Sequence, residues 1–551
     1  MLGAIAQFAS NAIDPASGSP LLETVPIGYG VGSVMWAFDR QTGWQCLDPD
    51  YDPTGKPPKQ TQRLILPELQ RNATDPKLIS DTFEYLHPTH KPARATVWRE
   101  LVRQCEADTG VDLGWVITAA DDVNHYPANY STKDRVTFRD GGIEITDRPK
   151  VRDWWQTQHR NRFCVIDGLC HVSGETVPLT TKLEKVKGCP GANGSGASMT
   201  TNYRPAFQSW NQGEDHAYVS YKLNHAVRVG LEALLSDRES CLRLGSIAWI
   251  AWTESSPFQL DPLSYPADPA TFIKSLDVFK ARSISTDTHQ LHIACLRGDA
   301  GRIAVLHYSA DEPITITENI KHWFAVQASV FDGESNLTQA KKGQNTKPMP
   351  MAFGLKALIE ATLSPGQKVN DRTGDINALM RSALFARPLP SQLLARLLSR
   401  LFNPANKTTR AQRSMLALCL NYQPMSQSLS DADRQVARLH GRLLALYAQA
   451  QKKANGMGDI AQTMAYRSLA RYGKTPHVLS LRLAEALGPW RSKLNRNGQD
   501  DWLVNEIQRV QSELAEYETP TSFSLYQQGE FAMAFTAELA YKPKEKSEPA
   551  K

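Results

Sequence analysis

The chain has 551 residues, of which 41% are hydrophobic and 22% charged, as in ordinary globular proteins. At about 150 residues per domain, this length allows roughly three or four domains. Its first residues carry no positive charge, and no apolar run approaches the roughly 20 residues that cross a bilayer, so we expect neither secretion nor membrane insertion.

The first half of the sequence predicts alternating strands and helices. Residues 31–47 have the pattern of strand, turn and strand, and residues 135–146 that of a hairpin around Asp140-Gly141. Residues 151–162 are expected to form a helix, with Trp154 and Trp155 in the core. Residues 245–252 predict a buried strand, and residues 291–308 a second hairpin that turns at residues 298–301. We therefore predict an α+β N-terminal region (1–160) and an α+β core (161–374).

The last third of the sequence changes to apolar residues at helical spacing. Residues 375–541 predict a helical bundle, and Ser430 with Asp433 forms a capping signal at the start of its longest helix. Residues 542–551 are too polar to pack and are expected to be disordered. The predicted fold class is α+β: a mixed N-terminal body with antiparallel strands, followed by a C-terminal helical bundle.

The net charge of the whole chain is only +5, but one segment is strongly basic. Residues 381–500 contain 19 Lys and Arg but only 5 acidic residues, a net charge of +14, which leaves −9 elsewhere. A polyanionic partner would offset the repulsion within such a segment, whereas solvated helix faces would explain it without a partner.

The eight cysteines contain no C-x-x-C pair, so the sequence predicts reduced thiols in the cytoplasm rather than disulfides or a zinc finger. Asp48, Asp50 and Asp52 alternate as in a calcium loop, but proline occupies the position where the loop needs glycine. A zinc site would have to use Cys164, Cys170, His171 and Cys189, and two of these are adjacent. We therefore predict no metal, no cofactor and no catalytic residues.

The segment most indicative of function is residues 182–207. It combines lysines with glycines 188, 191, 194 and 196 and with small polar residues. Glycine permits close approach to a polyanion, while hydroxyls and amides donate to phosphates or base edges. A flexible connector would have a similar composition. The candidate nucleic-acid-binding residues in this segment are Lys187, Asn193, Ser195, Ser198 and Asn202.

The same segment resembles a known family. CHVSGETVPLTTKLEKVKGCPGANGSGAS (170–198) is similar to the Ser/Thr-Gly-Glu opening and glycine-serine loop of the subtype I-C CRISPR large subunit, a component of the Cascade surveillance complex. The resemblance continues through residues 206–210, 217–220, 245–254, 293–308 and 318–324, and into residues 378–401.

This resemblance implies a non-catalytic subunit of a crRNA-guided complex in antiviral defence. Such a subunit would read the short protospacer-adjacent motif (PAM) in target duplex DNA, support R-loop formation and recruit a helicase-nuclease. Its partners would be crRNA, target DNA, the handle-capping and backbone subunits, and a small subunit translated from an internal start at Met425, or alternatively Met415. Further candidate contacts are Arg71, Asn72 and Lys77 near the N-terminus, and Arg434, Arg438 and Arg442 on one helical face for the single strand.

Two other functions remain open from the sequence. A metal-dependent nuclease could use the three alternating aspartates or the Cys/His cluster. A purely structural scaffold could place its basic helices against acidic protein or guide RNA.

Overall fold

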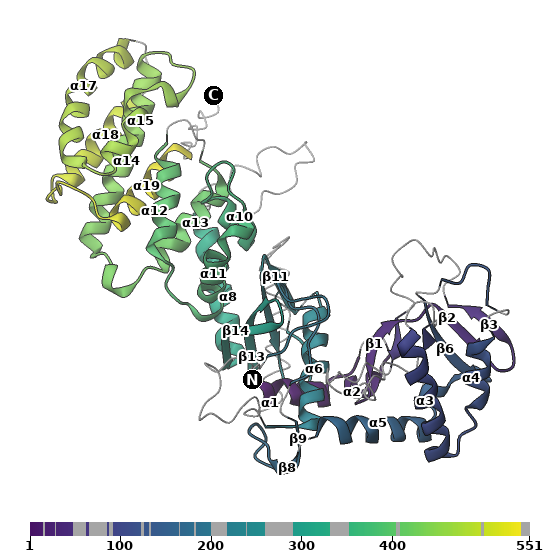
Figure 1. Cartoon of the computed structure of the whole chain (residues 1–551). Helices are drawn as coiled ribbons and strands as arrows, with labels where there is room; N and C mark the ends of the chain where they lie inside the picture. The colour runs from purple at the N-terminus through teal and green to yellow at the C-terminus, as the bar shows by residue number, and fades with distance from the viewer. Residues whose placement is uncertain are drawn as a thin grey trace, which may run out of the picture. The chain divides into compact units, whose positions relative to one another are not determined.

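In the computed structural model, the described residues are 1–14, 17–27, 29–47, 62–65, 85–86, 92–122, 126–131, 134–164, 166–180, 183–199, 218–238, 240–258, 260, 290–330, 352–403, 408–496 and 501–540 (Figure 1). The chain divides into two compact units. The first comprises Met1–Ser236, Trp252–Pro257 and Gly298–Ala304, and the second comprises the remainder. The predicted boundaries near residues 160 and 374 remain predictions.

The first unit contains most of the short strands. Its helices are α1 (Leu2–Asn11), α2 (Leu21–Thr24), α3 (Pro92–Thr109), α4 (Gly114–Asp121), α5 (Pro149–Phe163) and α6 (Tyr221–Ser236). Its strands are β1 (Gly30–Ser33), β2 (Trp36–Asp39), β3 (Gly43–Cys46), β4 (Gln62–Ile65), β5 (Tyr85–Leu86), β6 (Arg135–Asp140), β7 (Ile143–Glu144), β8 (Ile166–Leu169), β9 (Thr176–Thr180) and β10 (Val219–Ser220).

The largest sheet of this unit has the order β3-β2-β6-β5, with β7 paired to β6. All its pairings are antiparallel except that of β2 with β6. The β6–β7 hairpin confirms the sequence prediction with one correction. Asp140 pairs with Ile143, so the two turn residues are Gly141 and Gly142, both with positive φ. Two adjacent residues in this conformation form a primed turn, whose twist matches that of the strands.

The core of this sheet is aromatic. Trp36, Trp98, Phe138 and Trp155 are buried among aliphatic residues of α3, α4 and α5. The predicted burial of Trp154 and Trp155 is confirmed. A second sheet, of order β10-β9-β8, leads into α6, which packs against α1.

The second unit begins with a four-stranded sheet of order β11-β12-β13-β14. Its strands are β11 (Cys241–Leu244), β12 (Ile247–Trp252), β13 (Leu291–Asp299) and β14 (Arg302–Asp311). The tip of the β13–β14 hairpin, Gly298–Ala304, belongs to the first unit. Every residue of β12 is buried, as the sequence predicted.

The rest of the second unit is helical. Its helices are α8 (Pro313–Ser329), α10 (Leu355–Glu360), α11 (Thr373–Phe385), α12 (Ser391–Leu401), α13 (Arg410–Asn421), α14 (Asp431–Ala454), α15 (Met464–Arg467), α16 (Leu469–Tyr472), α17 (Pro476–Arg496), α18 (Asp501–Leu514) and α19 (Leu525–Ala540). The mixed body and helix-rich C-terminal part confirm the predicted fold class. The Ser430 cap is also confirmed, since its hydroxyl accepts the Asp433 N–H at 3.1 Å.

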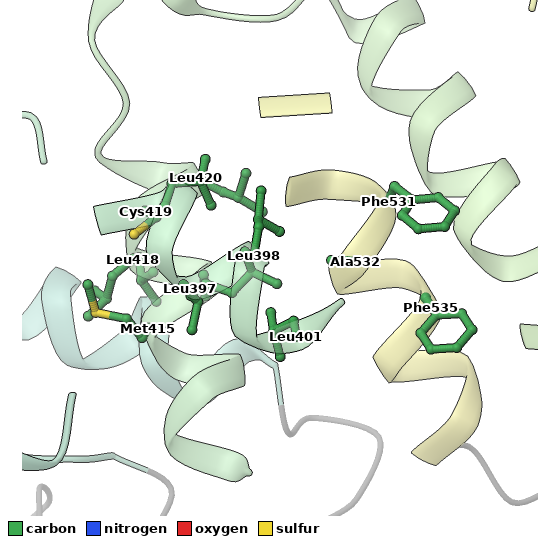
Figure 2. Packing of buried hydrophobic residues seen from close by; sticks show 14 of the residues in the cluster. Leu397, Leu398, Leu401, Met415, Leu418, Cys419, Leu420, Phe531, Ala532 and Phe535 are labelled. Atoms are coloured by element: carbon green, nitrogen blue, oxygen red, sulfur yellow. The ribbon is translucent and has the colours of Figure 1, made fainter. Parts of the chain in front are cut away.

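The long helix α14 is the centre of this bundle and packs against α15, α17, α18 and α19. Helix α19 also packs against α12 and α13, and Figure 2 shows it beside their leucines. Gly529 of α19 permits this approach, because a Cβ atom there would lie 2.8 Å from Leu420 Cδ2. Among the described residues, no helix is both long enough and apolar enough to cross a bilayer.

Candidate nucleic-acid interface

Residues 183–199, hereafter the glycine loop, are the described part of the segment that the sequence marked as a nucleic-acid contact. The start of this loop is bound to α6 by hydrogen bonds from its backbone. The Glu184 N–H donates to Asn224 Oδ1 at 2.9 Å, and the Lys187 N–H donates to Glu232 Oε1 at 2.8 Å. A loop held in this way presents its side chains from a fixed backbone.

A cluster of charged and polar side chains reinforces this anchor. The Arg228 guanidinium contacts the Glu184 carboxylate through Nε and donates from Nη2 to the Tyr29 carbonyl oxygen at 2.9 Å. His225 Nε2 donates to the Val25 carbonyl oxygen at 2.8 Å. Burial acts to raise the pKa of Glu184, but the polar contact with His225 and the positive charge of Arg228 outweigh it and lower that pKa to about 2. Glu184 therefore stays ionised at neutral pH.

The middle of the glycine loop is joined to the tip of the β13–β14 hairpin through backbone groups. The Gly298 N–H donates to the Pro190 carbonyl at 2.8 Å, and the Asn193 N–H donates to the Ala300 carbonyl at 2.8 Å. Further along, the Ser198 N–H donates to the Gly301 carbonyl at 3.0 Å. Ala300 adopts a left-handed conformation with φ of 49°, which is uncommon for a residue with a side chain.

The contact between the glycine loop and this hairpin tip was not predicted from the sequence. The predicted turn at residues 298–301 is confirmed for Ala300 and Gly301, whereas Gly298 and Asp299 belong to β13. Nothing in the sequence paired this tip with residues 190–198, more than 100 positions earlier. The available signal was Gly298 itself, because a glycine next to or within a strand often marks close approach of another backbone.

The predicted contact residues of the loop occupy two different environments. Lys187, Asn193 and Ser195 are exposed, and the side chains of Asn193 and Ser195 make no hydrogen bond to the described residues. Ser198 is buried, and its hydroxyl donates to the Leu183 carbonyl oxygen at 3.3 Å. Ser198 therefore has a structural role within the loop, and its contact with nucleic acid stays a prediction.

Five further predictions lie outside the described residues. These are the nucleic-acid contacts Arg71, Asn72, Lys77 and Asn202, and the aspartate loop at positions 48, 50 and 52.

The three arginines predicted to hold single-stranded DNA do share one face of α14. Arg434 Nε and Arg438 Nε lie 3.1 and 2.8 Å from the two carboxylate oxygens of Glu530 in α19. Arg442 contacts Glu538 at 3.1 Å through Nε and Glu506 at 2.7 Å through Nη2. Each arginine therefore has a structural partner, and binding of phosphate stays a prediction for all three.

These ion pairs change the interpretation of the basic segment. Residues 501–540, immediately after it, contain seven acidic residues and one arginine. Three of those acids, Glu506, Glu530 and Glu538, are the partners of the α14 arginines. The chain thus neutralises part of the +14 charge internally. The charge count over residues 381–500 missed this, because the acidic partners lie after residue 500.

The cysteines are free thiols, all eight of them. Cys170 is buried, and its Sγ accepts the Ser220 N–H at 3.1 Å, so backbone donors occupy the sulfur. In the part of the chain that the structure describes, no group of three or more His, Cys, Asp or Glu is arranged to hold a metal ion.

Comparison with known proteins gives the chain a family. It matches a family of CRISPR-associated proteins, the class that the sequence resemblance implied, and the match extends over residues 19–539. The chain belongs to this family, described as CRISPR-associated protein (Cas_Csd1). No curated protein matches the chain.

Proposed function

We propose that this chain is the non-catalytic large subunit of a type I-C Cascade complex. In this role it recognises the PAM in target duplex DNA, supports R-loop formation, binds the non-target strand and recruits the helicase-nuclease in the cytoplasm. Its family membership supports a role in CRISPR immunity. Its partners are crRNA, target DNA, the handle-capping and backbone subunits, and the helicase-nuclease.

The observation that carries PAM recognition is the exposed tip of the glycine loop. Asn193 and Ser195 have exposed side chains on a backbone fixed to the hairpin tip. Base readout requires hydrogen-bonding groups that are both available and held in a defined orientation, because their geometry must discriminate between base edges. The amide of Asn193 can donate and accept, as adenine recognition requires.

The test is DNA binding by the assembled complex across a library of randomised PAM triplets at fixed salt. Fixed salt is needed because the phosphate contribution varies with ionic strength. We expect Asn193→Ala and Ser195→Ala to flatten the PAM preference, while Ser364→Ala, at an exposed serine of the second unit, leaves it unchanged. A complex that retains its PAM preference without this subunit would refute the recognition role and favour a scaffold.

The proposed small subunit would begin at Met425. This residue is 94% exposed and lies between α13 and α14, so translation from it would yield α14 to α19 as a unit. Such a product would lack α12 and α13, which pack on α19 in the full chain (Figure 2).

A further inference from the structure

A cleft of about 570 Å³ lies in the helical bundle of the second unit, between α8, α13, α14 and α19. This volume is within the range of sites that hold small ligands. Its polar lining includes Arg413, Arg434, Arg438 and Glu530. The two positive charges of Arg434 and Arg438 exceed the single negative charge of Glu530, which favours an anionic ligand.

Glu530 pairs with two of these arginines. The residue is 4% exposed, and its carboxylate accepts a hydrogen bond from Arg438 Nε at 2.8 Å. Arg434 Nε lies 3.1 Å from the same carboxylate and forms an ion pair without a hydrogen bond. The terminal amino groups of Arg438 have no partner among the described residues, and its side chain is half exposed. Among the residues that the structure describes, the terminal amino groups of Arg434 reach Asp431 alone, at 3.7 Å. The carboxylate therefore holds both guanidinium groups at this wall of the cleft and leaves the terminal amino groups of Arg438 as donors for a ligand.

The rest of the lining contains the polar residues Ser329 and Asn421 and the apolar residues Ala417, Leu420, Met533 and Ala537. A ligand that fits the whole cleft would thus combine an anionic group with hydrogen-bonding groups and an apolar face. A nucleotide has all three, in its phosphate, its base edge and its base or sugar face. An inorganic ion would leave the apolar wall unfilled.

We infer that this cleft binds one nucleotide, with the phosphate on Arg434 and Arg438 and the base or sugar on the apolar wall. The inference rests on the proposed function. Of the three arginines predicted to bind single-stranded DNA, it assigns phosphate binding to Arg434 and Arg438, because these two line the cleft. Arg442 lies outside the cleft, with Nε and Nη2 each on a carboxylate. The nucleotide would come either from a displaced DNA strand or from the free pool.

The test uses the full chain and two probes: a fluorescein-labelled 20-nucleotide oligo(dT), followed by anisotropy, and unlabelled thymidine monophosphate as competitor. We expect Arg438→Gln to weaken oligonucleotide binding at least tenfold. Ala537→Trp should do the same by filling the cleft without changing charge, since Ala537 is exposed. The matched controls are Arg467→Gln and Ala484→Trp, at exposed positions outside the cleft, with changes below twofold.

If thymidine monophosphate at low concentration displaces the oligonucleotide, the ligand is a free nucleotide. If it does not, the ligand is the DNA strand. Either result supports nucleotide binding in the cleft. Equal binding by wild type, Arg438→Gln and Ala537→Trp, or no oligonucleotide or monophosphate binding by wild type, would overturn the inference. Stronger competition by polyglutamate than by unlabelled oligo(dT) would also overturn it, in favour of an acidic protein partner. The PAM assay reports separately on the proposed function, because it reads the glycine loop and not this cleft.

Discussion

Gly191 and Gly298 approach each other so closely that neither could carry a side chain. A Cβ atom on Gly191 would lie 2.5 Å from the Gly298 carbonyl oxygen, and one on Gly298 would lie 2.2 Å from the Ala192 nitrogen. Gly191 also has a positive φ of 81°, which a residue with a side chain rarely adopts. The glycine loop and the hairpin tip are therefore fitted together by their backbones.

We predict that Gly298→Ala separates the loop from the hairpin tip. The overpacking should cost about 1–3 kcal/mol of unfolding free energy. It should also lower DNA affinity, because the exposed loop residues would lose their fixed positions. Urea denaturation and DNA binding measure the two effects.

Gly194→Ala is the matched control, since a Cβ atom there meets nothing within 4 Å and Gly194 has no positive φ. It should keep wild-type stability. Gly298→Ala with unchanged stability and DNA affinity would contradict the proposed role of the contact.

The second prediction concerns Glu530. Glu530→Gln removes the charge that holds Arg434 and Arg438, and it should lower the unfolding free energy by about 1–2 kcal/mol. We expect less than for a fully buried pair, because the two arginine side chains are 32% and 50% exposed and can be hydrated.

Lys356→Gln serves as the control for Glu530→Gln. Lys356 pairs with Glu360 at 4.0 Å with both side chains more than half exposed, so its loss should cost no more than about 0.5 kcal/mol. Equal stabilities of the two variants by chemical denaturation would show that the Glu530 contacts do not stabilise the bundle.

The third prediction concerns the internal start. Met425→Leu should abolish a C-terminally tagged product of residues 425–551 and leave the full-length chain stable, since Met425 is 94% exposed. Met415→Leu, a volume-conserving change at a fully buried position, tests the alternative start. Immunoblotting and intact mass distinguish the two products. Detection of full-length protein alone in wild type would argue against any internal start.

The fourth prediction is a pH dependence of the helical bundle. His440 is buried with Nδ1 3.0 Å from the Tyr472 hydroxyl, and burial lowers the pKa of His440 to about 4. Between about pH 6.5 and pH 4, the histidine of the unfolded chain, with a pKa near 6.5, is protonated, whereas His440 in the folded chain stays neutral. Stability should thus be complete above about pH 6.5 and decline as the pH falls toward 4, by up to about 3 kcal/mol.

Denaturant titrations of wild type and His440→Gln between pH 7 and 4 measure this contribution. The informative quantity is the slope of the unfolding free energy against pH, because the substitution itself also changes stability by an amount that does not depend on pH. Parallel pH profiles for the two proteins would assign the dependence to other groups.

Local sequence patterns predicted much of the fold. The hairpin at residues 135–146 follows from its glycines, and the start of α14 follows from Ser430, because turns and caps depend on a few neighbouring residues. The amphipathic spacing around Leu439 and Leu443 also determined which face of α14 is buried. The motif around the glycine loop carried the resemblance to a CRISPR subunit.

Only the tertiary structure decided which distant groups meet. The sequence placed Arg434, Arg438 and Arg442 on one helical face but could not give them Glu530, Glu538 and Glu506 as partners, because those contacts depend on how α14, α18 and α19 pack. The pairing of Gly191 with Gly298 likewise depends on long-range packing. Local propensity acts over a few residues, whereas burial and ion pairing act between segments that the fold brings together.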